Sequence, residues 1–190
     1  MSGKNKVFEI GGINHLALVC KDMARTVDFY SNVLGMPLVK TIDLPKGMGQ
    51  HFFFDIGNGD CLAFFWFPDA PPAAPGIASA ANLPGKSIVS AHGSMNHVAF
   101  NVPAEKIDEY HDKLVAKGIK VTKILNHDDS EYQVSLELTP TTFVRSIYFY
   151  DPDGICLEFA AWTRALDPKT DAIHEPVDAS GKKHARVPAE

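Results

Sequence analysis

The stretch Ile13-Asn14-His15-Leu16-Ala17 returns later in the chain as Met95-Asn96-His97-Val98-Ala99, and this repeat decides the fold. Both stretches are predicted strands, on which side chains point alternately to the two faces of a sheet. The two histidines occupy the same position in the repeat. The recurrence therefore indicates two copies of one structural module.

A helix is predicted after each of these strands, because apolar residues recur there at helical spacing. The first helix begins near Asp22, a suitable N-cap residue, and ends at Gly35. The second begins near Pro103 and ends at Gly118. Each opening strand is thus followed by one helix.

The modules also end alike, with the sequence CLAF at residues 61–64 and CLEF at residues 156–159. Before each of these strands lie another apolar strand and a tight turn, which contains Asn58-Gly59 in one module and Asp153-Gly154 in the other. Each module is therefore predicted to be βαβββ. The predicted fold class is α+β, with two tandem βαβββ modules forming a curved mixed sheet around a metal cavity.

These patterns divide the chain into four parts. The first βαβββ module is predicted at residues 10–67, a Pro-, Ala- and Gly-rich linker at 68–91, the second module at 92–161, and a C-terminal tail without periodicity at 162–190. The second module contains a longer internal loop. A short strand is predicted there at Tyr132–Leu138, in a segment that is a candidate active-site loop.

Composition excludes several classes of partner. The chain has 190 residues, 45% hydrophobic and 22% charged, as in ordinary globular proteins. Its net charge of −5 and the lack of a Lys/Arg run argue against nucleic acid or an anionic membrane as partner. The sequence lacks an apolar stretch of membrane-spanning length, and residues 1–6 lack the core of a signal peptide. The three cysteines are an odd number, expected as buried residues in a reducing compartment, so a cytoplasmic location is expected.

A metal site is predicted from His15, His97 and Glu158. A single histidine in an apolar strand is usually a core residue, but two at equivalent repeat positions are less easily explained that way. Glu158 lies between Leu157 and Phe159, and burying an unpaired carboxylate is costly. If the modules pack about a pseudo-two-fold axis, the three side chains converge. Two histidines and one carboxylate suit Fe(II) or Mn(II), and Zn(II) also accepts such ligands.

On these residues the chain resembles the vicinal-oxygen-chelate superfamily, over about residues 10–162. That superfamily includes glyoxalase I, bleomycin- and fosfomycin-resistance proteins, methylmalonyl-CoA epimerase and type I extradiol dioxygenases. The resemblance implies a soluble metal-dependent enzyme, expected to be a homo-oligomer, with a small-molecule substrate.

Position 63 favours one activity within this superfamily. Ala63 is the repeat counterpart of Glu158. At the position of Ala63, glyoxalase I and the epimerase carry a Glu or Gln that serves as a fourth metal ligand. Extradiol dioxygenases have a small residue there. Residues 147–158 resemble part of the extradiol signature, and Tyr148 falls on the tyrosine that contacts the catechol oxygen. The resemblance implies an Fe(II)- or Mn(II)-dependent dioxygenase that cleaves a catechol-like diol with O2.

Two features depart from that signature. The extradiol signature has a histidine at about the position of Thr139–Thr141, and this chain has none there. The histidine that acts as acid and base in extradiol dioxygenases corresponds to about Asp60, which is the first candidate for proton transfer. His51 is a second candidate for proton transfer, because it shares strand parity with Phe53, the repeat counterpart of Tyr148. The remaining histidines at positions 92, 111 and 127 are expected on the surface or in loops, with His127 an outside candidate on the possible active-site loop. The alternatives are a metal-dependent isomerase or lyase of the glyoxalase type, and a bleomycin-resistance-like binding protein, which would not need the metal ligands.

Overall fold

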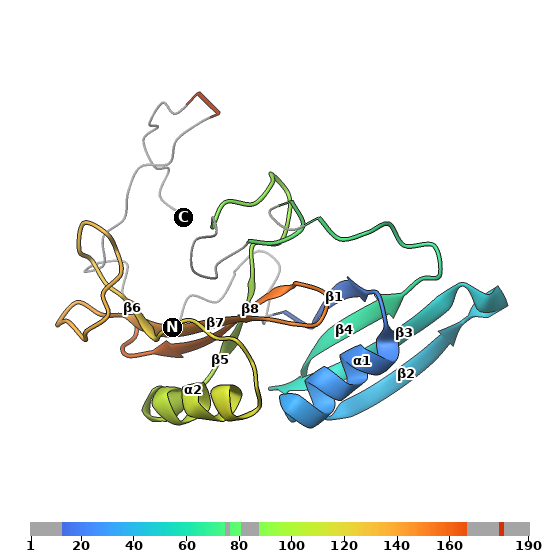
Figure 1. Cartoon of the computed structure of the whole chain (residues 1–190), viewed down its shortest axis with the longest axis horizontal. Helices are drawn as coiled ribbons and strands as arrows, with labels where there is room; N and C mark the ends of the chain where they lie inside the picture. Colours follow the sequence, from blue (N-terminus) through green and yellow to red (C-terminus); the bar gives the residue numbers. More distant parts are fainter. Residues whose placement is uncertain (1–12, 75–76, 81–87, 167–178, 181–190) are drawn as a thin grey trace, which may run out of the picture.

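The protein is described by a computed structural model that covers residues 13–74, 77–80, 88–166 and 179–180. It contains two modules, each with a four-stranded sheet and a helix on one face of that sheet (Figure 1). The first module contains β1 (His15–Cys20), α1 (Met23–Val27), η1 (Asp28–Val33), β2 (Leu38–Leu44), η2 (Pro45–Gly47), β3 (Gly49–Gly57) and β4 (Asp60–Trp66). The second contains β5 (Val98–Asn101), η3 (Ala104–Lys106), α2 (Ile107–Ala116), β6 (Leu125–His127), β7 (Val144–Tyr150) and β8 (Cys156–Trp162). The α+β prediction with two βαβββ modules is confirmed.

The two sheets have the same topology. The strand orders are β1-β4-β3-β2 and β5-β8-β7-β6, with the first pair of each sheet parallel and the other pairs antiparallel. In the described part of the chain the two sheets are not hydrogen-bonded to each other, so the predicted single curved sheet is not formed within one chain. The opening strands β1 and β5 each lie at the edge of their own sheet. They keep one side open for further pairing.

The strand register confirms the alignment of the repeat. Phe53 pairs with Ala63 in the first sheet, as Tyr148 pairs with Glu158 in the second. Ala63 also lies beside Ala17. Glu158 therefore occupies in the second module the place that Ala63 occupies in the first.

The first helix is less regular than the sequence predicted. Asp22 caps it as expected, because its carboxylate accepts a hydrogen bond from the backbone N–H of Arg25 at 3.1 Å. After Val27 the helix widens into the π-helical turn η1. A π-turn rotates the side chains relative to a regular helix, and as a result Phe29 and Tyr30 are both buried. The second helix begins after the 3-10 turn that follows Pro103, close to the predicted start.

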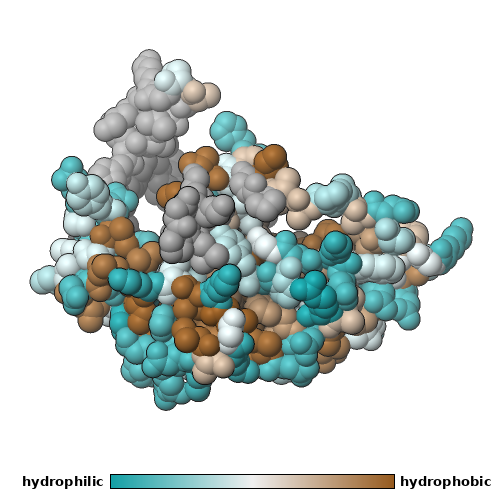
Figure 2. Space-filling view, viewed as in Figure 1, coloured by the Kyte–Doolittle hydropathy of each residue, from teal (hydrophilic) through white to brown (hydrophobic). Residues whose placement is uncertain are grey.

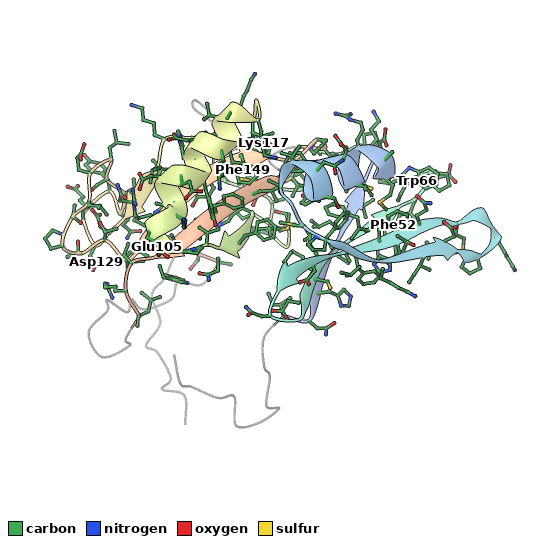
Figure 3. All side chains as sticks on the ribbon, turned by 90° about the horizontal axis from the view of Figure 1, so that it is seen from below. Phe52, Trp66, Glu105, Lys117, Asp129 and Phe149 are labelled. Carbon is green, nitrogen blue, oxygen red and sulfur yellow. The ribbon has the colours of Figure 1, made fainter. Side chains whose placement is uncertain are left out.

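The hydrophobic core lies between each sheet and its helix. Phe54 and Phe64 pack around Tyr30 in the first module, and Phe149 and Leu157 belong to the core on the side of α2 in the second. Figure 3, seen from the helix side, shows α2 lying over this part of its sheet. In the described part of the chain, the opposite face of each sheet carries no helix. We call these the open faces.

The two modules are joined by polar contacts near the end of β1. The Tyr30 hydroxyl donates to Asp151 Oδ2 at 3.2 Å, with both side chains buried. The backbone N–H of Lys21 donates to Asp153 Oδ2 at 2.9 Å. The turn that precedes β8 is therefore held against the first module.

Several further expectations can be compared with the structure. The strand predicted at Tyr132–Leu138 is wrong, since only an isolated bridge between Asn126 and Ser135 forms there. The three cysteines are free and lie in strands; two are buried and Cys61 is partly exposed. Trp162, assigned to the tail, still belongs to β8, while residues 167–178 and 181–190 of the predicted tail lie outside the described residues. Within the described chain, none of the helices is long and apolar enough to cross a membrane.

Candidate metal centre

The open face of the second sheet brings together His97 and Glu158. Because side chains alternate along a strand, Leu157 and Phe159 point to the helix side of the sheet, and Glu158 points to the open face, as predicted. The distance from His97 Nε2 to Glu158 Oε2 is 2.9 Å, and the carboxylate is buried. One nitrogen and one carboxylate oxygen thus lie close enough to bind the same ion.

An asparagine orients each predicted histidine ligand. Asn96 Oδ1 lies 2.8 Å from His97 Nδ1, and Asn14 Oδ1 lies at the same distance from His15 Nδ1. The Asn96 amide is itself held, because it donates to the backbone oxygen of Ile88 at 2.9 Å. The contact at Nδ1 fixes the orientation of each ring, so that Nε2 is the nitrogen that would face a metal. The repeated Asn-His pair carried this signal in the sequence, although the asparagine was not singled out.

The surroundings keep Glu158 ionised. Burial raises the pKa of Glu158, but the hydrogen bond from His97 and the neighbouring Ser146 and His127 lower it by more, so the pKa lies below its usual value. The pKa of Tyr148 is raised well above its usual value, first by burial and then by the charge of Glu158. At neutral pH the site therefore presents a carboxylate beside a protonated phenol.

One residue of this cluster, Ser146, was missed by the sequence analysis, and another, His127, was only an outside candidate there. His127 was expected in a loop, but it ends β6 and its Nε2 lies 3.4 Å from the Tyr148 hydroxyl. Ser146 is fully buried on the same face, and within the part of the chain that the structure describes its hydroxyl makes no hydrogen bond of ordinary geometry. A strand of only three residues has too little alternation to be recognised, so the position of His127 was hidden.

His15 does not join this cluster within one chain. It is exposed on the open face of the first sheet, where its ring contacts Phe53 with centroids 5.7 Å apart. Among the described residues no group of three His, Cys, Asp or Glu side chains is placed to hold a metal. The prediction that the three ligands converge assumed that the open faces of the two sheets meet within one chain. In the structure the two open faces belong to separate sheets, and His15 is not close to the other two ligands. The structure therefore shows two of the three predicted ligands together and the third apart.

His51 and Asp60 lie in different surroundings. The His51 ring is on the open face, as predicted, and stacks on Phe65 with centroids 3.6 Å apart and an interplanar angle of 12°. Its Nε2 is buried and has no hydrogen-bond partner among the described residues. Burial, followed by the charge of His15, lowers the pKa of His51. Asp60 instead pairs with Gly57 at the tight turn and shares strand parity with Leu62, on the helix side. Asp60 is therefore not placed with the other candidates.

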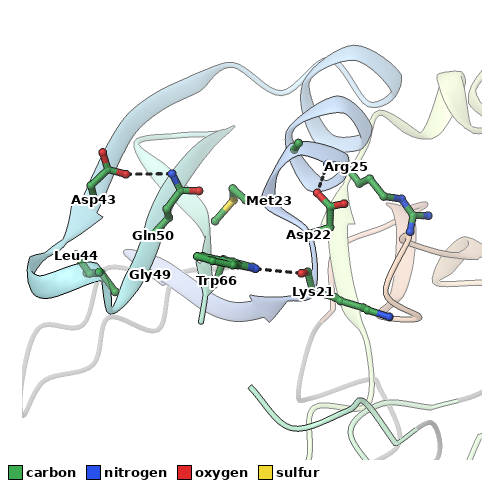
Figure 4. A pocket seen from close by; sticks show the side chains of 11 residues that line it. Lys21, Asp22, Met23, Arg25, Asp43, Leu44, Gly49, Gln50 and Trp66 are labelled. Atoms are coloured by element: carbon green, nitrogen blue, oxygen red, sulfur yellow. Dashed lines mark hydrogen bonds between the residues drawn. The ribbon is translucent and has the colours of Figure 1, made fainter. Parts of the chain in front are cut away.

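A separate groove of about 790 Å³ lies on the helix side of the first sheet (Figure 4). Trp66 lines it and donates from its indole nitrogen to the backbone oxygen of Lys21 at 3.1 Å. Gln50 donates to Asp43 across the neighbouring strands at 3.0 Å. None of the predicted metal ligands lines this groove, so it is distinct from the metal centre.

Comparison with known proteins gives the family. Residues 12–159 match the model of the Glyoxalase/Bleomycin resistance protein/Dioxygenase superfamily. The metallothiol transferase FosB of Lysinibacillus sphaericus is 29% identical over 81% of this chain and 84% of its own length. The fosfomycin resistance protein FosX of Listeria monocytogenes is 24% identical over 87% of this chain and 99% of its own.

A solved structure supports the fold. It is a FosX variant from Listeria monocytogenes complexed with Mn(II) and 1S,2S-dihydroxypropylphosphonic acid, with a TM-score of 0.53, 20% identity, and coverage of 85% of this chain and 99% of that one. These relatives are a metallothiol transferase and a fosfomycin resistance protein, and they do not support the preference for a ring-cleaving dioxygenase. The match over residues 12–159 shows that the chain belongs to the Glyoxalase/Bleomycin resistance protein/Dioxygenase superfamily.

Proposed function

We propose that this protein is a metal-dependent enzyme of the glyoxalase type that acts without redox chemistry on a small oxygen-chelating substrate. The divalent metal, Mn(II) or a similar ion, would be held by His97 and Glu158 of one copy and by His15 of a second copy. The observation that carries the proposal is the 2.9 Å contact between His97 Nε2 and Glu158, with the His97 ring oriented by Asn96. His15 is oriented in the same way, but no carboxylate of the described residues forms an ion pair with it.

A second copy is proposed because His15 is apart from the other two ligands. β1 and β5 are edge strands of equivalent sheets, so β1 of one copy can lie against β5 of another. Such an arrangement would bring His15 and His97 together, because they occupy equivalent positions at the starts of those strands. It would also cover the open face around Val19, which is 49% exposed.

The residues around the pair suit proton transfer next to a chelated oxygen. The bound metal would supply Lewis acidity, which polarises a carbonyl, epoxide or similar oxygen of the substrate. The protonated Tyr148 phenol can donate a hydrogen bond to that oxygen, and His127 at 3.4 Å can exchange a proton with Tyr148. His51, kept neutral by its surroundings, is a candidate base contributed by the second copy. The name of the relative FosB, a metallothiol transferase, supports such a reaction, because a group transfer involves no redox change.

Extradiol ring cleavage is the second candidate function. It is supported by Ala63, which lies where the repeat would place a counterpart of Glu158 and so adds no fourth ligand. Oxygen uptake with Fe(II) and a panel of catechols distinguishes the two functions. Uptake coupled to a yellow product would favour the dioxygenase over the non-redox enzyme.

Mixing two inactive variants tests the metal site between copies. His15→Ala and Glu158→Gln should each lose bound Mn(II), measured by metal analysis after desalting. If the copies are unfolded and refolded together in equal amounts, half of the dimers are mixed, and each mixed dimer retains one intact site. Metal content should then recover to about a quarter of the wild-type value for a two-fold dimer. No recovery, with both variants correctly folded, would contradict a site shared between copies.

A further inference from the structure

The linker between the two modules returns to the candidate metal centre. Figure 1 shows its described parts, residues 68–74, 77–80 and 88–91, on the side of the sheets opposite to α1 and α2. This is the side of the open faces, on which His97 and Glu158 lie. The sequence predicted this segment only as a connection, whereas the structure brings it into contact with residues of the second module.

One part of the linker holds the backbone of Asn96. Ser79 and Ala80 are buried, with 4% and 1% of their surfaces exposed. The backbone N–H of Ala80 donates to the backbone oxygen of Asn96 at 2.8 Å. The backbone oxygen of Ala80 accepts a hydrogen bond from the Tyr150 hydroxyl at 3.2 Å. These bonds fix the position of the residue that directly precedes His97.

A second part of the linker holds the side chain of Asn96. The amide nitrogen Nδ2 of Asn96 donates to the backbone oxygen of Ile88 at 2.9 Å and to the Ser90 hydroxyl at 3.1 Å. An asparagine amide has two hydrogens, so the linker uses both of its donors. The amide oxygen then faces His97 Nδ1, which lies 2.8 Å away. The Asn96 side chain thus connects the linker to the His97 ring.

Burial of apolar side chains does not explain why this second part lies against Asn96. Ile88 and Val89 are each 71% exposed. Figure 2 shows apolar surface on the side of the molecule along which the linker runs. Asn96 is exposed as well, so water competes for its amide, and a rotation of the amide would turn the oxygen away from His97. The two hydrogen bonds from Asn96 to the linker oppose that rotation.

We infer that the linker is a positioning element of the metal centre, in which Ser90 and the backbone oxygen of Ile88 act on His97 through Asn96. This inference rests on the proposed function, because His97 is one of the proposed metal ligands. A ligand whose ring is already oriented loses less conformational freedom when the metal binds, so a fixed Asn96 amide raises metal affinity. Ser90 is therefore a positioning residue that does not touch the metal.

A double-mutant cycle on the full chain tests this inference, with Mn(II) affinity measured from the EPR signal of the free ion. Ser90→Ala removes one acceptor of the Asn96 amide and should lower the affinity about three- to fivefold. In the Asn96→Ala background the same change should have no further effect, because Ser90 acts through Asn96. Ser94→Ala is the matched control and should leave the affinity unchanged, since the Ser94 hydroxyl donates to the backbone oxygen of Ala91 at 2.7 Å.

Two outcomes of the cycle would overturn the inference. One is an equal loss of affinity on Ser90→Ala in both backgrounds, which would mean that Ser90 does not act through Asn96. The other is an unchanged affinity of the Ser90→Ala variant, whether or not its unfolding temperature falls, which would leave Ser90 with a structural role at most.

Nuclear magnetic resonance of the metal-free full chain separates this inference from the proposed function. The ring nitrogen resonances of His97 report the hydrogen bond at Nδ1, so Ser90→Ala should shift them and Ser94→Ala should not. Unshifted His97 resonances in the Ser90→Ala variant would overturn the positioning role. Failure of the wild type to bind Mn(II) would instead overturn the proposed function, while a shift of the same resonances would still support the control of His97 by the linker.

Discussion

Replacing Asp151 by Asn should make the protein's stability less dependent on pH. Asp151 is 5% exposed; it accepts backbone N–H bonds from Asp153 and Ile155 and a hydroxyl bond from Tyr30. Burial outweighs these bonds and raises the pKa of Asp151 from 3.8 to about 6. An asparagine at this position retains an oxygen that can accept both backbone bonds, so the variant should fold.

The sign and size of the effect follow from linkage. Because the folded-state pKa exceeds the unfolded one, the folded protein holds the proton more tightly, and stability falls as pH rises through the window from about 4 to 6. A rise from 3.8 to about 6 corresponds to about 3 kcal/mol of lost unfolding free energy. The variant lacks this loss. The difference in stability between the variant and the wild type should therefore grow by about 2.5 kcal/mol between pH 4 and pH 7, since a small part of the loss already occurs below pH 4.

Urea unfolding at several pH values, followed by circular dichroism, measures this difference. Asp112→Asn is a suitable control, because the Asp112 side chain is 86% exposed and carries no comparable burial. A difference between wild type and Asp151→Asn that stays constant from pH 4 to pH 7 would refute the reasoning.

Three further predictions concern the site. Asn96→Ala should lower Mn(II) affinity about 10- to 100-fold by releasing the His97 ring, and unchanged affinity by calorimetry would contradict the orienting role. Ala63→Glu places a carboxylate at the repeat counterpart of Glu158, so Mn(II) binding should hold or rise while turnover falls; unchanged turnover with a bound fourth ligand would show that the open position is unimportant. Asp128 accepts hydrogen bonds from the Ser130 and Ser135 hydroxyls in the loop between β6 and β7, residues 128–143. Asp128→Asn removes acceptor capacity there, so limited proteolysis should cut the loop faster, and equal cutting rates would argue against this stabilising role.

The repeat made much of the sheet structure predictable. The repeat correctly identified Ala63 as the counterpart of Glu158 and Phe53 as the counterpart of Tyr148. The structure bears this out, because Phe53 pairs with Ala63 in one sheet as Tyr148 pairs with Glu158 in the other. These relations are local, since each depends only on the period of two along a strand and on one neighbouring strand. The same local reasoning placed His51 on the open face.

The features that were not predicted depend on contacts between residues, and the alternation of apolar and polar residues does not reveal these contacts. Residues 132–138 alternate apolar and polar residues, as in a strand, but the hydroxyls gathered by Asp128 close the segment into a loop instead. The separation of His15 from His97 reflects how two modules sit relative to each other, and alternation carries no information about that. Asp60 was placed by a resemblance to a family signature, and strand parity puts it on the wrong face for that role.

The division of the proposed ligands between two polypeptides has a consequence for how the enzyme acquires its metal. His97 and Glu158 alone offer a two-ligand site, which would hold an ion weakly. With His15 arriving from another copy, metal uptake and subunit association become a single coupled equilibrium governed by mass action. Diluting the protein should then release metal, and added metal should draw separated chains together. The cellular concentration of the protein would thereby set how much of it is active.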